Sequence, residues 1–363
     1  MKKVIGSTIF LISLMLPIIL IGCAPRIQKK PIDLVWPLPP DAPRLKYVGM
    51  VRSTLDVAKK RGFTETLFGT EQVDALKKPY GVAVDSAGRI YVTDIGRVMI
   101  FDLKKHDYGY IGDSPGTGKL GMAIGIAVTR DKRVFVSDIS ADRVFVYSTE
   151  GRFITAIGHK GEFLSPSGVA VDENNRFLYV VDSKKHRVSV YSLDSYKLLR
   201  TIGSRGLGED GKFNFPTNAA VDSKGNLYVV DTGNFRVQIF DKDGNFVSSI
   251  GKLGDSPGSF ARPKGIGIDS DDNIYVVDAA FQNVQIFNSD GQLLLYFGSA
   301  GWGPGHFILP AGLTVDSGDK VYVVDQWPGN VQIFQYMSKE YRERQALEKA
   351  PREKGTGGPG KKR

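Results

Sequence analysis

Acidic side chains recur at equivalent positions along this 363-residue chain, some of them with an arginine close behind. Asp231, for example, ends a short apolar run and is followed five residues later by Arg236. Such a pair can be a catalytic carboxylate with its partner, or an ion pair that links two strands. The equivalent aspartates are Asp94, Asp138, Asp182, Asp231, Asp278 and Asp325. Because a catalytic carboxylate is needed once or twice, six copies indicate a structural role, and we predict no catalytic residue.

The aspartates belong to an internal repeat. The word GVAVD at residues 81–85 returns in related form at 125, 168, 218, 265 and 312, with spacings of 44, 43, 50, 47 and 47 residues. Each copy continues with runs of the YVVD and VQIF type, and a less regular fourth run follows in all copies except the last. Runs of this length, rich in β-branched and aromatic residues and bounded by Gly, Asp and Asn, predict strands.

Four antiparallel strands in each of six copies predict an all-β fold, a six-bladed β-propeller. The sixth copy lacks its fourth strand, whereas residues 45–51, upstream of the first copy, carry the YVG ending of such a strand. We expect residues 45–51 to pair with residues 330–336 and close the last blade. Closure of this kind removes two strand edges that would otherwise promote aggregation.

The repeat words resemble a known family. The pattern P-x-G-V-A-V-D, I-Y-V-x-D and R-V-Q-I-F resembles the NHL repeat over residues 43–337. Copies four to six match closely, while copy two has Thr129 in place of the aspartate that ends the first strand. With the N-terminal features described next, the chain resembles bacterial lipoproteins of the six-bladed NHL-type propeller class. Membership of that class implies no single activity.

The N-terminus predicts export and a lipid anchor. Two lysines precede an apolar run over residues 4–21, as in a signal peptide. LIGC at residues 20–23 resembles the lipobox of bacterial lipoproteins, which implies a diacylglycerol on Cys23, the only cysteine of the chain. We expect a signal peptide over 1–22, a Pro-rich linker over 23–42, and a mature protein anchored in the cell envelope, at the periplasmic or surface side of the outer membrane. A transmembrane anchor is the alternative.

Two segments lie outside the repeat, and they hold part of the charge. Residues 52–78 are expected to form a capping insert on one end of the ring. Residues 338–363 are expected to form a short helix and a basic disordered tail. The net charge of +9 resides in the signal and the tails, so that the body over 47–337 is near neutral. A nucleic-acid partner is therefore not predicted.

Metal and cofactor sites are not indicated by the sequence. The four histidines, His106, His159, His186 and His306, share no position in the repeat. GTGKLG at 116–121 matches a phosphate-loop pattern, but no helix is predicted after it. We predict no metal and no cofactor. The alternative hypothesis is a metal-dependent propeller enzyme, of the lyase or lactonase type, with a site in the central channel near Asn218, which replaces the first glycine of copy four.

A binding surface is the leading functional hypothesis. The loops after the second and fourth strands of each blade share one face of a propeller, at the entrance of the channel. Their aromatic and cationic residues are candidates for a patch that binds an extracytoplasmic protein, peptide or glycan. The candidates are Tyr80, Lys184, Lys185, Phe235, Lys264, Phe281 and Trp327. The alternative is that the rings pack against neighbouring loops and bind no partner.

Overall fold

The structure is a computed structural model that describes residues 33–57, 73–159, 161–339, 341–343 and 345. Cys23, the predicted signal peptide, the centre of the insert over 52–78 and the predicted basic tail lie outside the described residues. Among the described residues, no helix has the length and apolar character needed to cross a bilayer.

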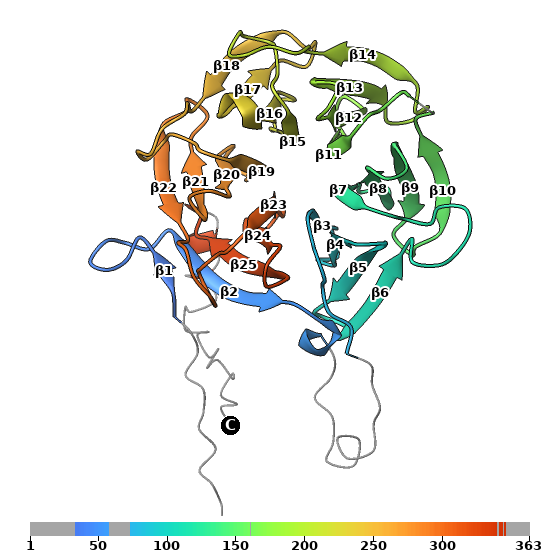
Figure 1. Ribbon diagram of the computed structural model, residues 1–363. Coiled ribbons are helices and arrows are strands. Elements are labelled where there is room, and N and C mark those ends of the chain that lie inside the picture. Colours follow the sequence, from blue (N-terminus) through green and yellow to red (C-terminus); the bar gives the residue numbers. More distant parts are fainter. Residues whose placement is uncertain (1–32, 58–72, 160, 340, 344, 346–363) are drawn as a thin grey trace, which may run out of the picture. The chain divides into compact units, whose positions relative to one another are not determined.

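Six antiparallel sheets are arranged as blades around a central axis, as Figure 1 shows. Five sheets have four strands, and the sheet that contains both ends of the repeat region has five. In each sheet the first strand of a repeat lies next to the axis and the fourth lies at the rim. The predicted all-β six-bladed propeller is therefore confirmed.

The strands fall into four concentric sets. The first strands are β3 (Val82–Val84), β7 (Ala123–Val128), β11 (Pro166–Asp172), β15 (Pro216–Val221), β19 (Pro263–Ile268) and β23 (Pro310–Val315). The second strands, which end at the recurrent aspartates, are β4 (Ile90–Asp94), β8 (Arg133–Asp138), β12 (Phe177–Asp182), β16 (Leu227–Asp231), β20 (Ile274–Asp278) and β24 (Lys320–Asp325). The third strands are β5 (Arg97–Asp102), β9 (Arg143–Ser148), β13 (Arg187–Ser192), β17 (Arg236–Phe240), β21 (Asn283–Phe287) and β25 (Asn330–Tyr336). The fourth strands are β6 (Asp107–Ile111), β10 (Phe153–Ile157), β14 (Leu198–Ile202), β18 (Phe246–Ile250), β22 (Leu293–Phe297) and β2 (Leu45–Val51).

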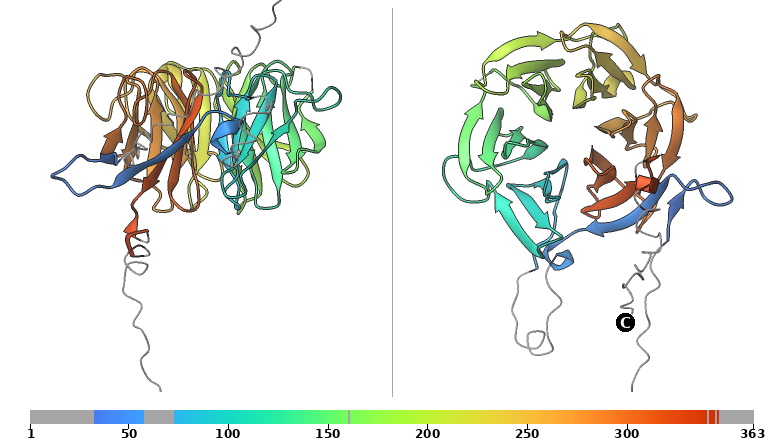
Figure 2. Two further views of the ribbon diagram at one scale, coloured as in Figure 1. Left: turned by 90° about the horizontal axis from the view of Figure 1, so that it is seen from below. Right: turned by 180° about the vertical axis from the view of Figure 1, so that it is seen from behind.

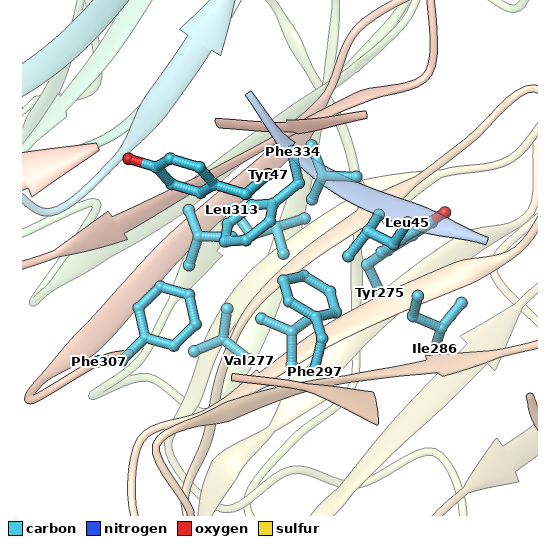
Figure 3. Close-up of a cluster of buried hydrophobic side chains, with 12 residues drawn as sticks. Leu45, Tyr47, Tyr275, Val277, Ile286, Phe297, Phe307, Leu313 and Phe334 are labelled. Atoms are coloured by element: carbon cyan, nitrogen blue, oxygen red, sulfur yellow. The ribbon is translucent and has the colours of Figure 1, made fainter. Parts of the chain in front are cut away.

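The N-terminal strand closes the ring. Strand β2 pairs antiparallel with β25, with Leu45 opposite Tyr336 and Val51 opposite Val331. Figure 3 shows Leu45 and Tyr47 of β2 in one apolar cluster with side chains of blades 5 and 6, and the Tyr47 ring lies 5.7 Å from that of Phe334. A buried side chain of this kind contributes roughly 2 kcal/mol. The predicted closure of the last blade is confirmed.

A fifth strand extends blade 6, and the sequence did not predict it. Strand β1 (Val35–Trp36) pairs with β2 inside the segment expected to be a linker. The Trp36 ring packs 5.9 Å from that of Phe297 and 5.7 Å from that of Phe334. Leu34 and Trp36 therefore pack against the core of blade 6, because an apolar Trp is available to cover the outer strand. The linker interpretation is wrong for β1.

The two described ends of the insert between β2 and β3 pair with each other. The amide of Thr54, in the short 3₁₀ helix η1 (Thr54–Asp56), donates to the carbonyl of Asp74 at 2.9 Å, and the amide of Leu76 donates to the carbonyl of Arg52 at 2.8 Å. Val57 and Leu76 are buried in the apolar cluster between blades 6 and 1. Beyond the last blade, residues 339, 341–343 and 345 are helical.

The core is divided among the blade interfaces, which gives the ring two distinct loop faces. Clusters of buried apolar side chains lie between each pair of adjacent blades. Because the strands alternate in direction, the loops before the first strand and after the second strand lie on the same face, here called the upper face. The turns after the first and third strands lie on the lower face, and Figure 2 shows both faces edge-on.

Candidate functional site

The first strands of the six blades enclose a narrow central channel. Its volume is about 290 Å³, and its lining is mostly Gly, Ala, Val, Ile and Leu of β3, β7, β11, β15, β19 and β23. Tyr80 and Asn218 are the polar side chains nearest its upper mouth, since each lies at the start of a first strand. The side chains that line the channel are therefore mostly apolar.

The first glycine of the repeat word, present in every copy except the fourth, lies at a close contact between blades. A Cβ on Gly312 of blade 6 would lie 2.2 Å from the carbonyl oxygen of Tyr80 in blade 1. The Gly312 amide donates to that same oxygen at 2.9 Å. A Cβ on Gly265 of blade 5 would similarly lie 2.3 Å from the carbonyl oxygen of Ala311. Glycine is required here because the backbones of neighbouring blades meet around the channel.

The recurrent aspartates hold the loops of the upper face in place. All six carboxylates are buried, and each accepts main-chain N–H bonds from the segment that leads into its own blade. Asp94 accepts from Lys77 and Lys78, Asp278 from Ala261 and Arg262. We call each carboxylate with its donors an aspartate socket. The sockets fix the residues that precede every first strand.

The predicted Asp–Arg pairs form in one of the three blades with the five-residue spacing. The Arg236 Nε donates to Asp231 at 3.1 Å, but neither Arg143 nor Arg187, both in the described part of the chain, pairs with its aspartate. Arg97, three residues after Asp94, also lies 3.6 Å from its carboxylate. The Asp–Arg link therefore forms in blades 1 and 4, and its prediction is wrong for Arg143 and Arg187. Asp231 accepts a single loop amide, since the next one, that of Phe215, donates to His186, so side chains complete its socket.

Tyr80 and Lys264 are brought together at the upper mouth of the channel. Tyr80 precedes β3 in blade 1 and Lys264 lies in β19 of blade 5, yet the Lys264 Nζ is 5.8 Å from the centre of the Tyr80 ring. Ala311 holds the equivalent repeat position in blade 6, which lies between blades 5 and 1 in the ring. A cation over an aromatic face is attracted by the ring quadrupole.

Two further cations surround this pair, and no acid balances them. Burial lowers the pKa of Lys264, and the positive charges of Arg262 and Lys78 lower it further. Burial also raises the pKa of Tyr80, against the opposing effect of Arg262. Within the described residues, the side chains of Lys78, Arg262 and Lys264 form no hydrogen bond or ion pair. We call Tyr80, Lys78, Arg262 and Lys264 the cationic mouth.

The other predicted surface residues have different surroundings. The Lys185 Nζ donates to the carbonyls of Gly161 and Glu162, at 2.6 and 2.9 Å, so it ties two loops together. Lys184 is exposed. Phe235 is half-buried against the apolar cluster between blades 4 and 5, and Phe281 is half-buried after β20. The structure thus places the two phenylalanines partly in packing contacts and does not join these residues to the cationic mouth.

Trp327 is exposed and has a partner that the sequence did not single out. Trp302 precedes β23 and Trp327 follows β24, so both lie on the upper face of blade 6. Their rings lie 6.3 Å apart in an edge-to-face arrangement, and the residues are 66% and 57% exposed. The amide of Gln326, next to Trp327, donates to the carbonyl of Leu309 at 3.0 Å, which holds this loop beside the start of β23. The pair therefore lies on blade 6, between the blades of Lys264 and Tyr80.

The lower mouth of the channel differs in charge. A recess of about 250 Å³ on that side is lined by residues that include Asp172, Glu173 and Asp222, and Arg130 pairs with Glu173. The described residues contain no group of three or more His, Cys, Asp or Glu side chains placed to hold a metal ion. Asn218 lies in the channel wall with its Oδ1 accepting from the Ala219 amide at 2.9 Å. The metal-enzyme alternative stays a prediction, which elemental analysis of the purified chain tests.

Sequence reasoning missed three residues at the upper face: Lys78, Arg262 and Trp302. Lys78 and Arg262 occupy the same repeat position, directly before the proline of K-P-Y-G and R-P-K-G. This shared repeat position is the feature of the sequence that could have identified both residues. No repeat signal marks Trp302, since it lies in a connection whose length varies between blades.

The chain matches a known protein family over more than half of its length. The family described as 6-bladed beta-propeller matches residues 122–204, 219–284 and 269–351, which together exceed half of the chain. The chain belongs to this family. The match includes the second to sixth blades of the propeller but not its first, which carries Tyr80.

Related sequences point to NHL repeats. NHL repeat-containing protein 3 of Mus musculus is 28% identical over 186 residues, which cover 45% of the propeller chain and 51% of that protein. Protein brain tumor of Drosophila melanogaster is 28% identical over 158 residues, 42% of this chain and 14% of that protein. The chain thus spans about half or less of the length of these curated relatives. The propeller has NHL-type relatives.

Solved structures share the fold at low sequence identity. A structure titled "Streptogramin B lyase structure" matches with a TM-score of 0.56 at 13% identity, covering 72% of this chain and 94% of that one. An auxiliary nutrient binding protein from Bacteroides thetaiotaomicron matches with a TM-score of 0.57 at 13% identity, covering 72% and 70%. At such identities the likeness shows the fold alone. The two names also illustrate that this fold carries different functions.

Proposed function

We propose that this propeller is a lipid-anchored, extracytoplasmic binding or scaffolding module, and that it binds a protein or peptide partner through its upper face. The observation that carries the proposal is the exposed Trp302–Trp327 pair on blade 6. Large aromatic side chains are normally withdrawn from water in a folded chain, and exposed ones concentrate where partners bind. Two of them in mutual contact present a preformed apolar surface.

The surroundings of the pair support a binding role. The sockets of Asp278 and Asp325 fix the main chain of Arg262, directly before β19, and of Leu309, directly before β23. A surface whose backbone is already held loses less conformational entropy on binding. The adjacent cations add the charge complementarity that guides association.

The test is partner capture with matched variants of the full-length protein. Trp302→Ala combined with Trp327→Ala removes the aromatic pair, and we expect it to abolish crosslinked capture of the partner from membranes. Leu198→Ala combined with Leu199→Ala is the control, since these residues are 47% and 50% exposed at the rim of blade 3. Equal capture by wild type and the tryptophan variant would contradict the proposal, provided that both show the same thermal unfolding.

The anchor is a separate part of the proposal and rests on the sequence around Cys23. An acyl chain on this thiol would fix the protein to a membrane, and two or more chains give stable anchoring. Cys23→Ser should move the protein from the membrane to the soluble fraction of the cell envelope or block its maturation. Unchanged incorporation of a labelled fatty acid into the variant would refute the anchor.

A further inference from the structure

Three cations meet at one side of the channel without a counter-charge. The half-buried Lys264 has its Nζ 5.8 Å from the centre of the Tyr80 ring. Arg262 and Lys78, two residues before Lys264 and Tyr80, are exposed, and the described residues provide no acid that pairs with any of the three cations. A half-withdrawn ammonium group that lacks an acceptor loses hydration without compensation. This unfavourable desolvation of a cation occurs at one position of the ring. A bound anion would reduce its free-energy cost.

The cationic mouth is held in place from below. Asp94 binds the amide of Lys78, and Asp278 binds the amide of Arg262, so both main chains are anchored by buried carboxylates. These carboxylates accept from main-chain amides and leave the charged ends of Lys78 and Arg262 unpaired. The Tyr80 ring supports Lys264 from the far side of blade 6. The main-chain positions from which the three cations extend are thus fixed by the fold.

We infer that the cationic mouth is a carboxylate-recognition site for an acidic peptide segment of the partner. This inference rests on the proposed function and specifies the chemistry of the ligand. Lys264, Arg262 and Lys78 would donate to aspartate or glutamate side chains, and Trp302 and Trp327 would contact neighbouring apolar residues of the same segment. Charge-assisted hydrogen bonds of this type are about twice as strong as neutral ones.

The choice of a peptide over a small inorganic anion follows from the tryptophan pair. An inorganic anion would make no apolar contact with two exposed indole rings, whereas interfaces with proteins are enriched in Trp and Arg. The lower mouth, with Asp172, Glu173 and Asp222, would repel an acidic segment. An acidic peptide segment is therefore expected to bind at the upper face and not at the lower face.

The experiment measures binding of a short fluorescein-labelled peptide with alternating Glu and Leu to the full-length protein, beside the same peptide with Gln for Glu. We expect the Glu peptide to bind more tightly and to lose affinity as NaCl is added. Lys264→Gln should weaken its binding about tenfold, the effect of losing one charge-assisted contact. The matched control is Lys224→Gln, an exposed lysine on the lower face, which should leave the affinity unchanged.

The outcomes separate this inference from the proposed function. Equal binding of the two peptides, or equal effects of Lys264→Gln and Lys224→Gln, would overturn carboxylate recognition. Binding of inorganic phosphate without any binding of the Glu peptide would overturn the peptide as ligand. If Lys264→Gln still captures the partner while the tryptophan variant does not, the inference fails and the proposed function stands. If both variants capture the partner as wild type does, the proposed function itself fails.

Discussion

Asp231 and Lys264 are both charged groups withdrawn from solvent, yet their surroundings are opposite. Asp231 is fully buried and accepts bonds from the Asn214 amide and from the side chains of Asn234, Arg236 and Gln238. Lys264 has a tyrosine ring at 5.8 Å and, in the described residues, no acceptor for its ammonium group. A compensated buried charge holds the fold together, whereas an uncompensated one costs stability. This contrast distinguishes a structural residue from a candidate binding residue.

The contrast also separates what repeats from what does not. The aspartate sockets occur in every blade and define the positions of the upper loops. The cationic mouth occurs once, where blades 5, 6 and 1 meet. Natural proteins depart from stability rules mainly at functional sites, which makes the single exception more informative than the repeated feature.

The largest effect is expected from breaking a socket. Asp231→Ala leaves the Arg236 guanidinium buried without its carboxylate and should lower the free energy of unfolding by about 3–5 kcal/mol. Urea denaturation of the full-length protein measures this. Asp243→Ala is the control, because Asp243 pairs with Lys242 at the exposed surface and should cost less than about 0.5 kcal/mol. Similar losses in the two variants would remove the distinction between socket and surface charge.

The partly exposed ion pair of Asp74 and Arg97 is expected to make an intermediate contribution to the free energy of unfolding, with a defined pH dependence. Asp74 in the insert accepts from the Arg97 guanidinium, which lowers its pKa, and from the Tyr110 hydroxyl at 2.9 Å. Asp74→Asn should therefore cost about 1 kcal/mol at neutral pH. Because the carboxyl is more acidic in the folded state, its contribution is present above about pH 4 and is lost as the pH falls further. A stability difference between wild type and variant that grows on acidification would contradict this assignment.

The smallest predicted change in the free energy of unfolding is an increase. Lys264→Met removes the uncompensated cation and should raise the free energy of unfolding by about 0.5–1 kcal/mol, and the melting temperature by about 2 °C. Since the pKa of Lys264 is lowered in the folded protein, the wild type should recover this difference as the pH rises toward about 10. Calorimetry across that pH range measures it, with Lys224→Met as control. A destabilised Lys264→Met variant would show that this lysine supports the fold.

Much of the fold could be predicted because each blade is encoded locally. Alternating β-branched residues and turn residues specify strands, and the missing fourth strand of the last copy indicated which N-terminal segment closes the ring. Strand β1 was not predicted, because two residues of strand carry no periodic signal. Asp–Arg pairing was predicted in three blades, but which donor reaches each carboxylate depends on loop amides that spacing does not place.

The sequence by itself determined the number of blades, their strands, the ring closure and the buried role of the recurrent aspartates, since all of these follow from repetition. Only the tertiary structure decided which unlike residues meet. Tyr80 and Lys264 lie in the first and fifth repeats, and they come within reach because closure of the ring brings its two ends together. Trp302 and Trp327 meet for a similar reason, through two loops that the Asp325 socket holds side by side. Side-chain encounters of this kind depend on the curvature of the closed ring, which no single repeat contains.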